Sequence, residues 1–181
     1  MQRIKERRKI LHIPSTHEIF LSLKGMTKYS NILANHNTDK PYIDFLRWLI
    51  ERNFYETWKE KITIKKIATD YKTENTKVTR WLKEIYGDIF VLNYEKPDLF
   101  YGGGTKVCLF FNHNDNYQDI FTFLPVIPRE FETVRFPFVK SKLGIDYFWV
   151  KRVEHEIFDE VTVTIWLQGG FGNKYREFTL E

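Results

Sequence analysis

The sequence has 181 residues but only one cysteine, Cys108, and no apolar run near the roughly 20 residues that span a bilayer. A single cysteine cannot form an internal disulfide, which favours a reducing compartment. The N-terminal stretch is charged and lacks the long apolar segment of a secretory signal. These absences predict a cytoplasmic protein that makes no use of a membrane.

Signatures of catalysis are also lacking. The glycines at 102–104 are followed by Thr-Lys and a strand-like pattern, whereas a Walker A loop needs Gly-Lys-Ser/Thr opening a helix. The histidines have no zinc-site spacing, and no nucleophile stands beside an activating residue in the sequence. His155 lies on the same face of its predicted strand as Val153 and Ile157, which predicts a hydrogen-bonded, half-buried side chain. The sequence predicts no enzyme, no cofactor and no metal, although a triad assembled only in space stays open.

Acidic residues are scarce in the first half of the chain. Residues 1–96 hold 19 Lys or Arg against 12 Asp or Glu, whereas residues 97–181 hold 9 against 12. The first half therefore carries a net charge of +7 and the second −3. A basic half is attracted to a polyanion, but a solvated face without a ligand would have the same composition.

Apolar residues are plentiful, at 43% of the chain with 17% aromatic, which excludes a wholly disordered protein. A short helix is predicted in THEIFLSLKG, capped by Thr16 and ended by Gly25, and a polar loop is predicted at 29–40. From Pro41, apolar residues at helical spacing predict a helix of about five turns over 41–60. Five basic side chains in QRIKERRK predict an N-terminal arm.

After a short strand in KITI, the sequence predicts two helices joined by a polar turn. Thr63 is expected to cap the first, and Asn75 the second, which runs over 76–86 and stops at Gly87. The apolar positions recur at helical spacing in both segments. The residues expected to face inward are Ile64, Ile67, Ala68, Tyr71, Val78, Leu82 and Ile85, with Trp81 beside them.

The segments that follow these helices are predicted to form two strands joined by a loop. DIFVLNYE predicts a strand, KPDLFYGGGT a glycine-tipped loop, and KVCLFFNH a second strand. A helix, a short strand, a helix–turn–helix and such a hairpin resemble the winged helix–turn–helix superfamily over residues 41–113. Ala68 matches the usual small residue of the first paired helix, whereas TEN stands in place of the usual turn glycine. The resemblance implies that the helix over 76–86 enters the major groove of DNA.

Polar side chains off the buried stripe of that helix are candidates for DNA contact. Arg80 is expected to bind guanine, and lysines early in the preceding helix are expected to bind phosphates. Two further lysines flank the glycine-tipped loop. The predicted DNA-binding set is Lys65, Lys66, Asn75, Thr76, Lys77, Thr79, Arg80, Lys83, Lys96 and Lys106. Because winged helices also bind proteins, a protein-interaction or structural assembly role stays open.

The remaining sequence is typical of β-structure. Strands are predicted at 119–127, 132–139, 146–157, 160–168 and 174–181. In the fourth, Val161, Val163, Ile165 and Leu167 alternate with Thr162, Thr164 and Trp166, so one face is expected to be core. The strands predict a small antiparallel β-barrel of SH3-like architecture. Its large aromatics, Phe136, Phe138, Phe148, Trp149, Trp166 and Phe171, either fill the barrel or form a surface for a homodimer or a protein partner.

The sequence therefore predicts an α+β protein in three parts: an arm with a short helix at 1–40, a winged helix–turn–helix at 41–113, and a small antiparallel β-barrel at 117–181. The expected function is sequence-dependent binding of double-stranded DNA, in transcription regulation or on a mobile element.

Overall fold

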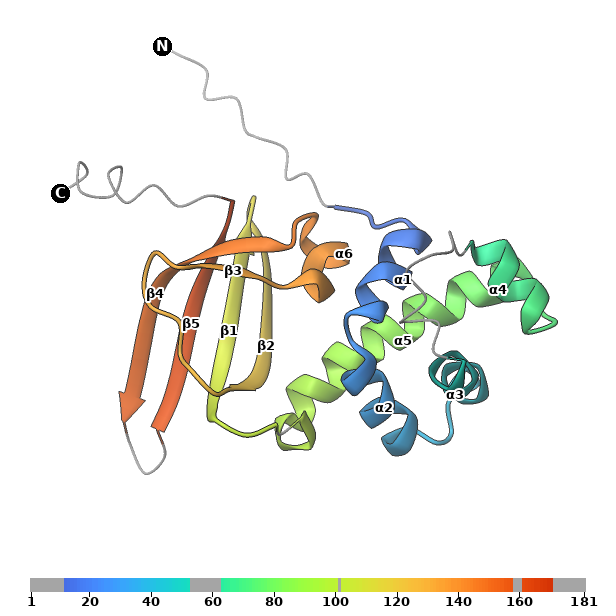
Figure 1. Ribbon diagram of the computed structural model, residues 1–181, viewed down its shortest axis with the longest axis horizontal. Helices are drawn as coiled ribbons and strands as arrows, with labels where there is room; N and C mark the ends of the chain where they lie inside the picture. The colour runs from blue at the N-terminus through green and yellow to red at the C-terminus, as the bar shows by residue number, and fades with distance from the viewer. Residues whose placement is uncertain (1–11, 53–62, 101, 158–160, 171–181) are drawn as a thin grey trace, which may run out of the picture.

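The computed structural model describes residues 12–52, 63–100, 102–157 and 161–170. The fold is α+β, with the larger helices gathered at one end and a curled five-stranded sheet, similar to half a barrel, at the other (Figure 1). The helices are α1 (Thr16–Lys24), α2 (Thr27–His36), α3 (Ile43–Glu51), α4 (Ile64–Asp70), α5 (Asn75–Glu95) and α6 (Lys140–Leu143), with 3-10 turns η1 (Pro97–Phe100) and η2 (Pro137–Val139). The strands are β1 (Thr105–His113), β2 (Asn116–Leu124), β3 (Thr133–Arg135), β4 (Tyr147–Ile157) and β5 (Val161–Gly169). Among these helices, none is long and apolar enough to cross a membrane.

Helix α1 is the predicted short helix and ends at Gly25 as expected. Its cap is Ser15 instead of Thr16. The Ser15 hydroxyl accepts a hydrogen bond from the Glu18 N–H at 3.2 Å, and the Glu18 carboxylate accepts one from the Ser15 N–H at 2.8 Å. This reciprocal capping box requires a Glu three residues after the cap, and Glu18 has that spacing only from Ser15.

The polar loop predicted at 29–40 is wrong over most of its length, because α2 continues to His36. The polar composition hides a narrow apolar stripe. Leu33 and Ala34 are buried, as is the small side chain of Ser30, so the tertiary contacts of one face are enough to hold a helix whose other face is solvated.

Helix α3 begins at Ile43 and ends at Glu51 with Arg52 as its C-cap, so it is shorter than predicted. Residues 53–60 of the predicted five-turn helix lie outside the described residues, as do the first two residues of KITI. Thr63 is extended and caps α4 as expected, accepting a hydrogen bond from the Lys66 N–H at 3.2 Å. Ile64 is the first residue of α4, as its place in the predicted helix requires, so the short strand does not extend to it.

Helix α5 departs most from the prediction. It does not stop at Gly87 but runs for 21 residues to Glu95, through the segment predicted as a strand. Ile89 and Leu92 continue the buried stripe of Ile85 at helical spacing, which explains why the helix persists. A Cβ at Gly87 would meet no atom within 4 Å, so the glycine lies on the open side of the helix. The predicted wing, a hairpin of 89–94 with 106–112, is therefore wrong.

The sheet has the strand order β2-β1-β5-β4-β3. Neighbouring strands are antiparallel except β1 and β5, which pair in parallel. The pairs β3–β4 and β4–β5 are antiparallel as predicted, but β2 joins them only through β1, so the predicted barrel is not a separate sheet. Strand β1, assigned to the wing, is a central strand of this sheet. The predicted boundary at 113–117 coincides with the turn between β1 and β2, which pair over their whole lengths.

The predicted strand at 132–139 is confirmed only for Thr133–Arg135. Pro137 has no N–H to donate to a neighbouring strand and instead begins η2, which leads into α6. The last predicted strand, at 174–181, lies outside the described residues.

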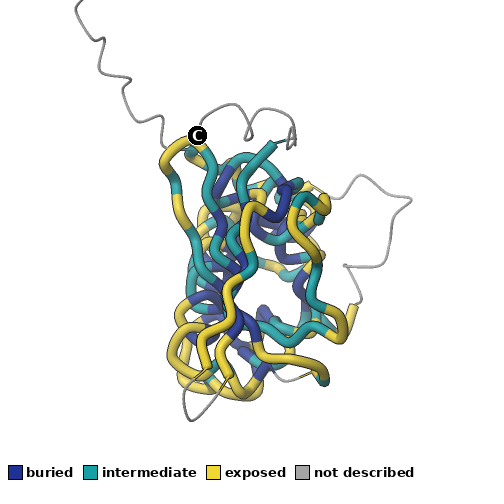
Figure 2. The backbone as a smooth tube through the Cα atoms, turned by 90° about the vertical axis from the view of Figure 1, so that its left-hand side faces the viewer, coloured by how far each residue is buried: buried dark blue, intermediate teal, exposed yellow. Residues whose placement is uncertain are grey.

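A continuous hydrophobic core joins the helices to one face of the sheet. On β5, Val163, Ile165 and Leu167 are buried as predicted, whereas Val161 at the strand's start is 56% exposed. Most exposed residues lie at the periphery of the backbone trace and most buried ones inside it (Figure 2). The sheet packs with α5, α6 and η1 through β2 and with η2 through the contact of Phe111 with Phe138, so it does not close a separate barrel.

Asn93, in the last turn of α5, links this helix to the free edge of β2. Its side chain is buried, donates to the Phe121 carbonyl at 2.7 Å and accepts from the Phe121 N–H at 2.9 Å. The amide thus supplies both hydrogen bonds that a further strand would make, and it protects an edge of the sheet.

Replacing Asn93 with Ala is expected to lower the free energy of unfolding by about 2–4 kcal/mol, because the N–H and carbonyl of Phe121 both lose a partly buried hydrogen-bond partner. Asn35→Ala, at an exposed position on α2, is the matched control and is expected to change stability by less than about 0.5 kcal/mol. Chemical denaturation measures both values. Equal stabilities of the two variants would contradict the structural role of Asn93.

Candidate nucleic-acid interface

Helices α4 and α5 are fixed against each other and against α3 by four aromatic rings. Phe45 and Trp48 come from α3, Tyr71 caps α4, and Trp81 lies on α5. The ring centroids of Phe45 lie 5.1 Å from Tyr71 and 5.2 Å from Trp81, and those of Trp48 and Tyr71 are 5.0 Å apart. Contacts of this kind hold two short helices in one relative orientation, which a helix–turn–helix requires.

The turn between α4 and α5 has one residue in the left-handed conformation, Lys72, with φ of 57°. The Thr73 N–H donates to the Ala68 carbonyl at 2.9 Å, and the Lys72 N–H donates to the Thr69 carbonyl at 3.1 Å. These bonds close α4 in the manner of a Schellman motif, in which glycine is the usual left-handed residue. The position that favours glycine is thus Lys72, immediately before TEN.

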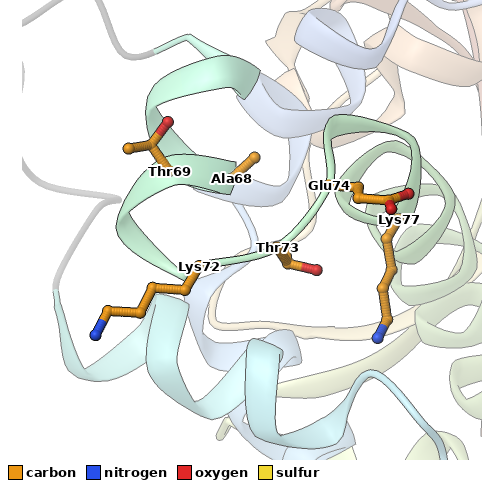
Figure 3. A pocket seen from close by; sticks show the side chains of 6 residues that line it. All are labelled: Ala68, Thr69, Lys72, Thr73, Glu74 and Lys77. Carbon is orange, nitrogen blue, oxygen red and sulfur yellow. The ribbon is translucent and has the colours of Figure 1, made fainter.

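An open groove of about 520 Å³ lies where α4 ends and α5 begins, lined by Ala68, Thr69, Lys72, Thr73, Glu74 and Lys77. In Figure 3 the side chains of Lys72 and Lys77 extend away from α4 on either side of Thr73. Lys72 and Thr73 were missed as candidates, because the turn was treated only as a connection. Their position in the turn between two paired helices could have identified them as candidates for ligand contact.

The predicted residues on α4 and α5 lie in one region of the surface. Lys65 and Lys66 occupy the first turn of α4, and Asn75 is the first residue of α5, not its cap, which is Glu74. Thr79 is half-buried. The other seven, Lys65, Lys66, Asn75, Thr76, Lys77, Arg80 and Lys83, are exposed.

Several of these side chains already have partners. Arg80 lies 3.7 Å from the Glu84 carboxylate, the Thr76 hydroxyl donates to Glu74 at 3.1 Å, and the Lys77 ammonium lies 4.7 Å from the Trp81 ring centre. Over residues 63–84, six Lys or Arg face three Asp or Glu, which leaves a net charge of +3. The region is therefore basic but not uniformly so.

The two lysines predicted to flank the wing do not join this region. Lys96 is the C-cap of α5 and lies 3.0 Å from His36, while Lys106 forms a 2.8 Å ion pair with Asp98. Because α5 is continuous, Lys96 stands 19 residues beyond Lys77, which is about 28 Å along the helix axis. They were misplaced because their assignment depended on the hairpin.

Two other side chains that bear on catalysis lie outside this region. His155 is exposed, so the predicted half-buried environment is wrong. Burial raises the pKa of Cys108 to about 11, which makes its thiolate scarce at neutral pH. Within the described residues, no group of three His, Cys, Asp or Glu could hold a metal ion.

No family model, curated protein or solved structure matches this chain. The helix–turn–helix part of the resemblance, in α4 and α5, therefore stays a prediction, whereas the wing is excluded by the helix over 89–94.

Replacing Lys72 with Gly is expected to make the protein about 1 kcal/mol more stable than replacing it with Ala. Both changes remove the charge, but only glycine adopts the left-handed conformation without a Cβ penalty. Thermal and chemical denaturation of the two variants measure the difference. A Lys72→Ala protein at least as stable as Lys72→Gly would contradict the strained turn.

Proposed function

We propose that the protein binds double-stranded DNA through α4 and α5, with the N-terminal half of α5 in the major groove. The observation that carries the proposal is the exposed stripe of Thr76, Arg80 and Lys83, on the side of α5 opposite Val78, Leu82 and Ile85. These three follow one another at i, i+4 and i+7, so they project from one side of the helix. The role would be transcription regulation or a DNA-binding task on a mobile element.

Each part of the region has a use in this arrangement. Lysines at the start of α4 and in the turn, Lys65, Lys66 and Lys72, suit phosphates beside the groove, which fix position without reading sequence. The N–H groups at the start of α5 have no side-chain cap and favour negative charge through the helix dipole. The planar guanidinium of Arg80 can donate two hydrogen bonds to O6 and N7 of a guanine.

The ion pair between Arg80 and Glu84 is compatible with this role. Both side chains are substantially exposed, at 64% and 41%, and exposed pairs of this kind contribute little to stability. Arg80 can therefore exchange a carboxylate for a base edge at small cost. Glu84, four residues along the helix, keeps the guanidinium on the exposed stripe when DNA is absent.

A protein partner is the second candidate function. The exposed stripe of α5 continues through Gly87 to Val91 and Tyr94, which are 54% and 66% exposed. Large apolar side chains on a solvent-facing helix favour a protein surface over a phosphate backbone. The two candidates differ in their dependence on salt, because binding to DNA releases counterions.

Titration of duplex DNA, followed by fluorescence anisotropy at several salt concentrations, tests the proposal. Lys77→Ala with Lys83→Ala is expected to weaken binding to all sequences alike and to reduce the salt slope by about one unit per lost phosphate contact. Arg80→Ala is expected to cost about 1–3 kcal/mol on a preferred site and much less on random DNA.

Lys151→Ala is the matched control, because Lys151 is an exposed lysine on β4, away from α4 and α5. This variant should bind like the unmodified protein. Thermal melts establish that every variant is folded. No duplex binding at low salt by folded protein, or unchanged affinity of the variant lacking Lys77, Arg80 and Lys83, would contradict the proposal and favour the protein partner.

A further inference from the structure

The sheet has an aromatic cluster on the face that points away from the core. Phe110 of β1 lies 4.5 Å from Trp166 of β5 and 5.8 Å from Tyr117 of β2, measured between ring centres. The guanidinium of Arg152 on β4 lies 5.0 Å from the Trp166 ring centre. Neither the core cluster nor the partly buried side chains packed against it include these three rings. Together with Arg152 they form a separate surface across four strands.

The strand register arranges this surface in rows. Asp119 pairs with Phe110, Phe110 with Trp166, and Trp166 with Arg152. One row across the sheet therefore has the order acidic, aromatic, aromatic, basic. Asp119 and Arg152 stand three strands apart, about 14 Å, so they do not neutralise each other within one chain.

The adjacent row has a similar order of chemical groups. Tyr117 pairs with Asn112, Asn112 with Gln168, and Gln168 with Trp149. The row is therefore ring, amide, amide, ring. Both rows are centred on the line between β1 and β5.

The charge of this face does not suit nucleic acid. Its basic side chains, Lys106, Arg135 and Arg152, are no more numerous than its acidic ones, Asp119, Glu154 and Glu156. Arg152 is already 3.1 Å from Glu154, and Arg135 is 2.8 Å from Asp146. Lys106, on the same face, is paired with Asp98 at 2.8 Å. Aromatic rings with Arg and charges of both signs are typical of a protein interface.

We infer that this face binds the same face of a second copy of the chain, about a two-fold axis that runs parallel to the strands between β1 and β5. Such an axis reverses each row. Asp119 then lies opposite the partner's Arg152, and Phe110 opposite the partner's Trp166. In the adjacent row, Asn112 lies opposite the partner's Gln168, whereas Trp149 is buried against Phe131 of its own chain and makes no contact across the axis.

A two-fold axis at right angles to the strands would instead place each row against itself in the same order. Asp119 would then face the partner's Asp119, and like charges opposed at an interface are unfavourable. The order of charges therefore selects one orientation. Because the sheet is curled, its convex faces would meet along the crest, where Phe110 and Trp166 lie.

Charge reversal tests the interface without DNA, so the outcome is independent of the proposed function. Sedimentation of the full-length protein over a concentration series measures the dimer dissociation constant. Asp119→Arg and Arg152→Asp each place like charges opposite one another and are expected to raise it at least about tenfold. The double variant restores opposite charges and is expected to return to within about threefold of the unmodified value.

Lys65→Glu, a charge reversal on α4 far from this face, is the control and should leave the dissociation constant unchanged. Circular dichroism melts check that each variant is folded. A protein that stays monomeric over the whole series, single variants that dimerise normally, or folded proteins in which the double variant is no better than the single ones would overturn the inference.

The single cysteine provides a second measurement that needs no substitution. Cys108 neighbours Phe110 on the same side of β1, so two copies would lie beside the axis, roughly 11 Å apart for sheets packed about 10 Å from each other. A short bismaleimide is expected to give a covalent dimer on a denaturing gel. The reaction needs to be long, because the pKa of Cys108 is raised to about 11. Labelled monomer without covalent dimer would overturn the inference.

Discussion

The double hydrogen bond between Asn93 and the backbone of Phe121 fixes the end of α5 against the sheet, and the rest of the structure depends on α5 being one continuous helix. Its first half packs with α4 and the aromatic rings of α3, and its second half packs with β2 and η1. Near its middle, Asp88 accepts a 2.5 Å hydrogen bond from Tyr42 and forms a 3.1 Å ion pair with Lys40. One helix thus supplies buried residues to the helical end and to the sheet, so neither end has a core of its own.

This continuity also determines where a ligand could bind. At 21 residues, α5 is about 31 Å long, so its basic start and its apolar, exposed end are different surfaces. The start carries Arg80 and Lys83 beside the lysines of α4. The end, with Val91 and Tyr94, lies next to the sheet, where Tyr94 contacts the Phe121 ring at 6.2 Å. A polyanion and a protein partner would therefore bind at opposite ends of α5.

Local patterns predicted those elements whose stability is decided locally. Helices α1 and α4, the first half of α5, and strands β2, β4 and β5 were found from caps and apolar spacing. The segment DIFVLNYE was not, because its aromatic and β-branched residues favour a strand while their spacing also fits a helix, and only packing on the sheet decides between them. The parallel pair of β1 and β5 joins segments more than fifty residues apart, which no local pattern encodes. In the candidate interface, the sequence correctly grouped the residues on α4 and α5. Lys96 and Lys106 were assigned to it only because a hairpin was predicted between them, and Lys72 was not considered because it lies in the turn.

The two proposed surfaces do not overlap, and this separation has an energetic consequence. A single α5 in one groove offers few phosphate contacts, and the three acidic residues of the region weaken the attraction further. If two chains are joined through their sheets, the second α5 binds within the same complex, and its effective concentration replaces its free concentration. Because each α5 is held to its own sheet by Asn93, a dimer of sheets would also fix the distance between the two helices. DNA with two half-sites at that spacing would then be favoured over DNA with one. Specificity would depend on the rigidity of the link between sheet and helix as much as on Arg80.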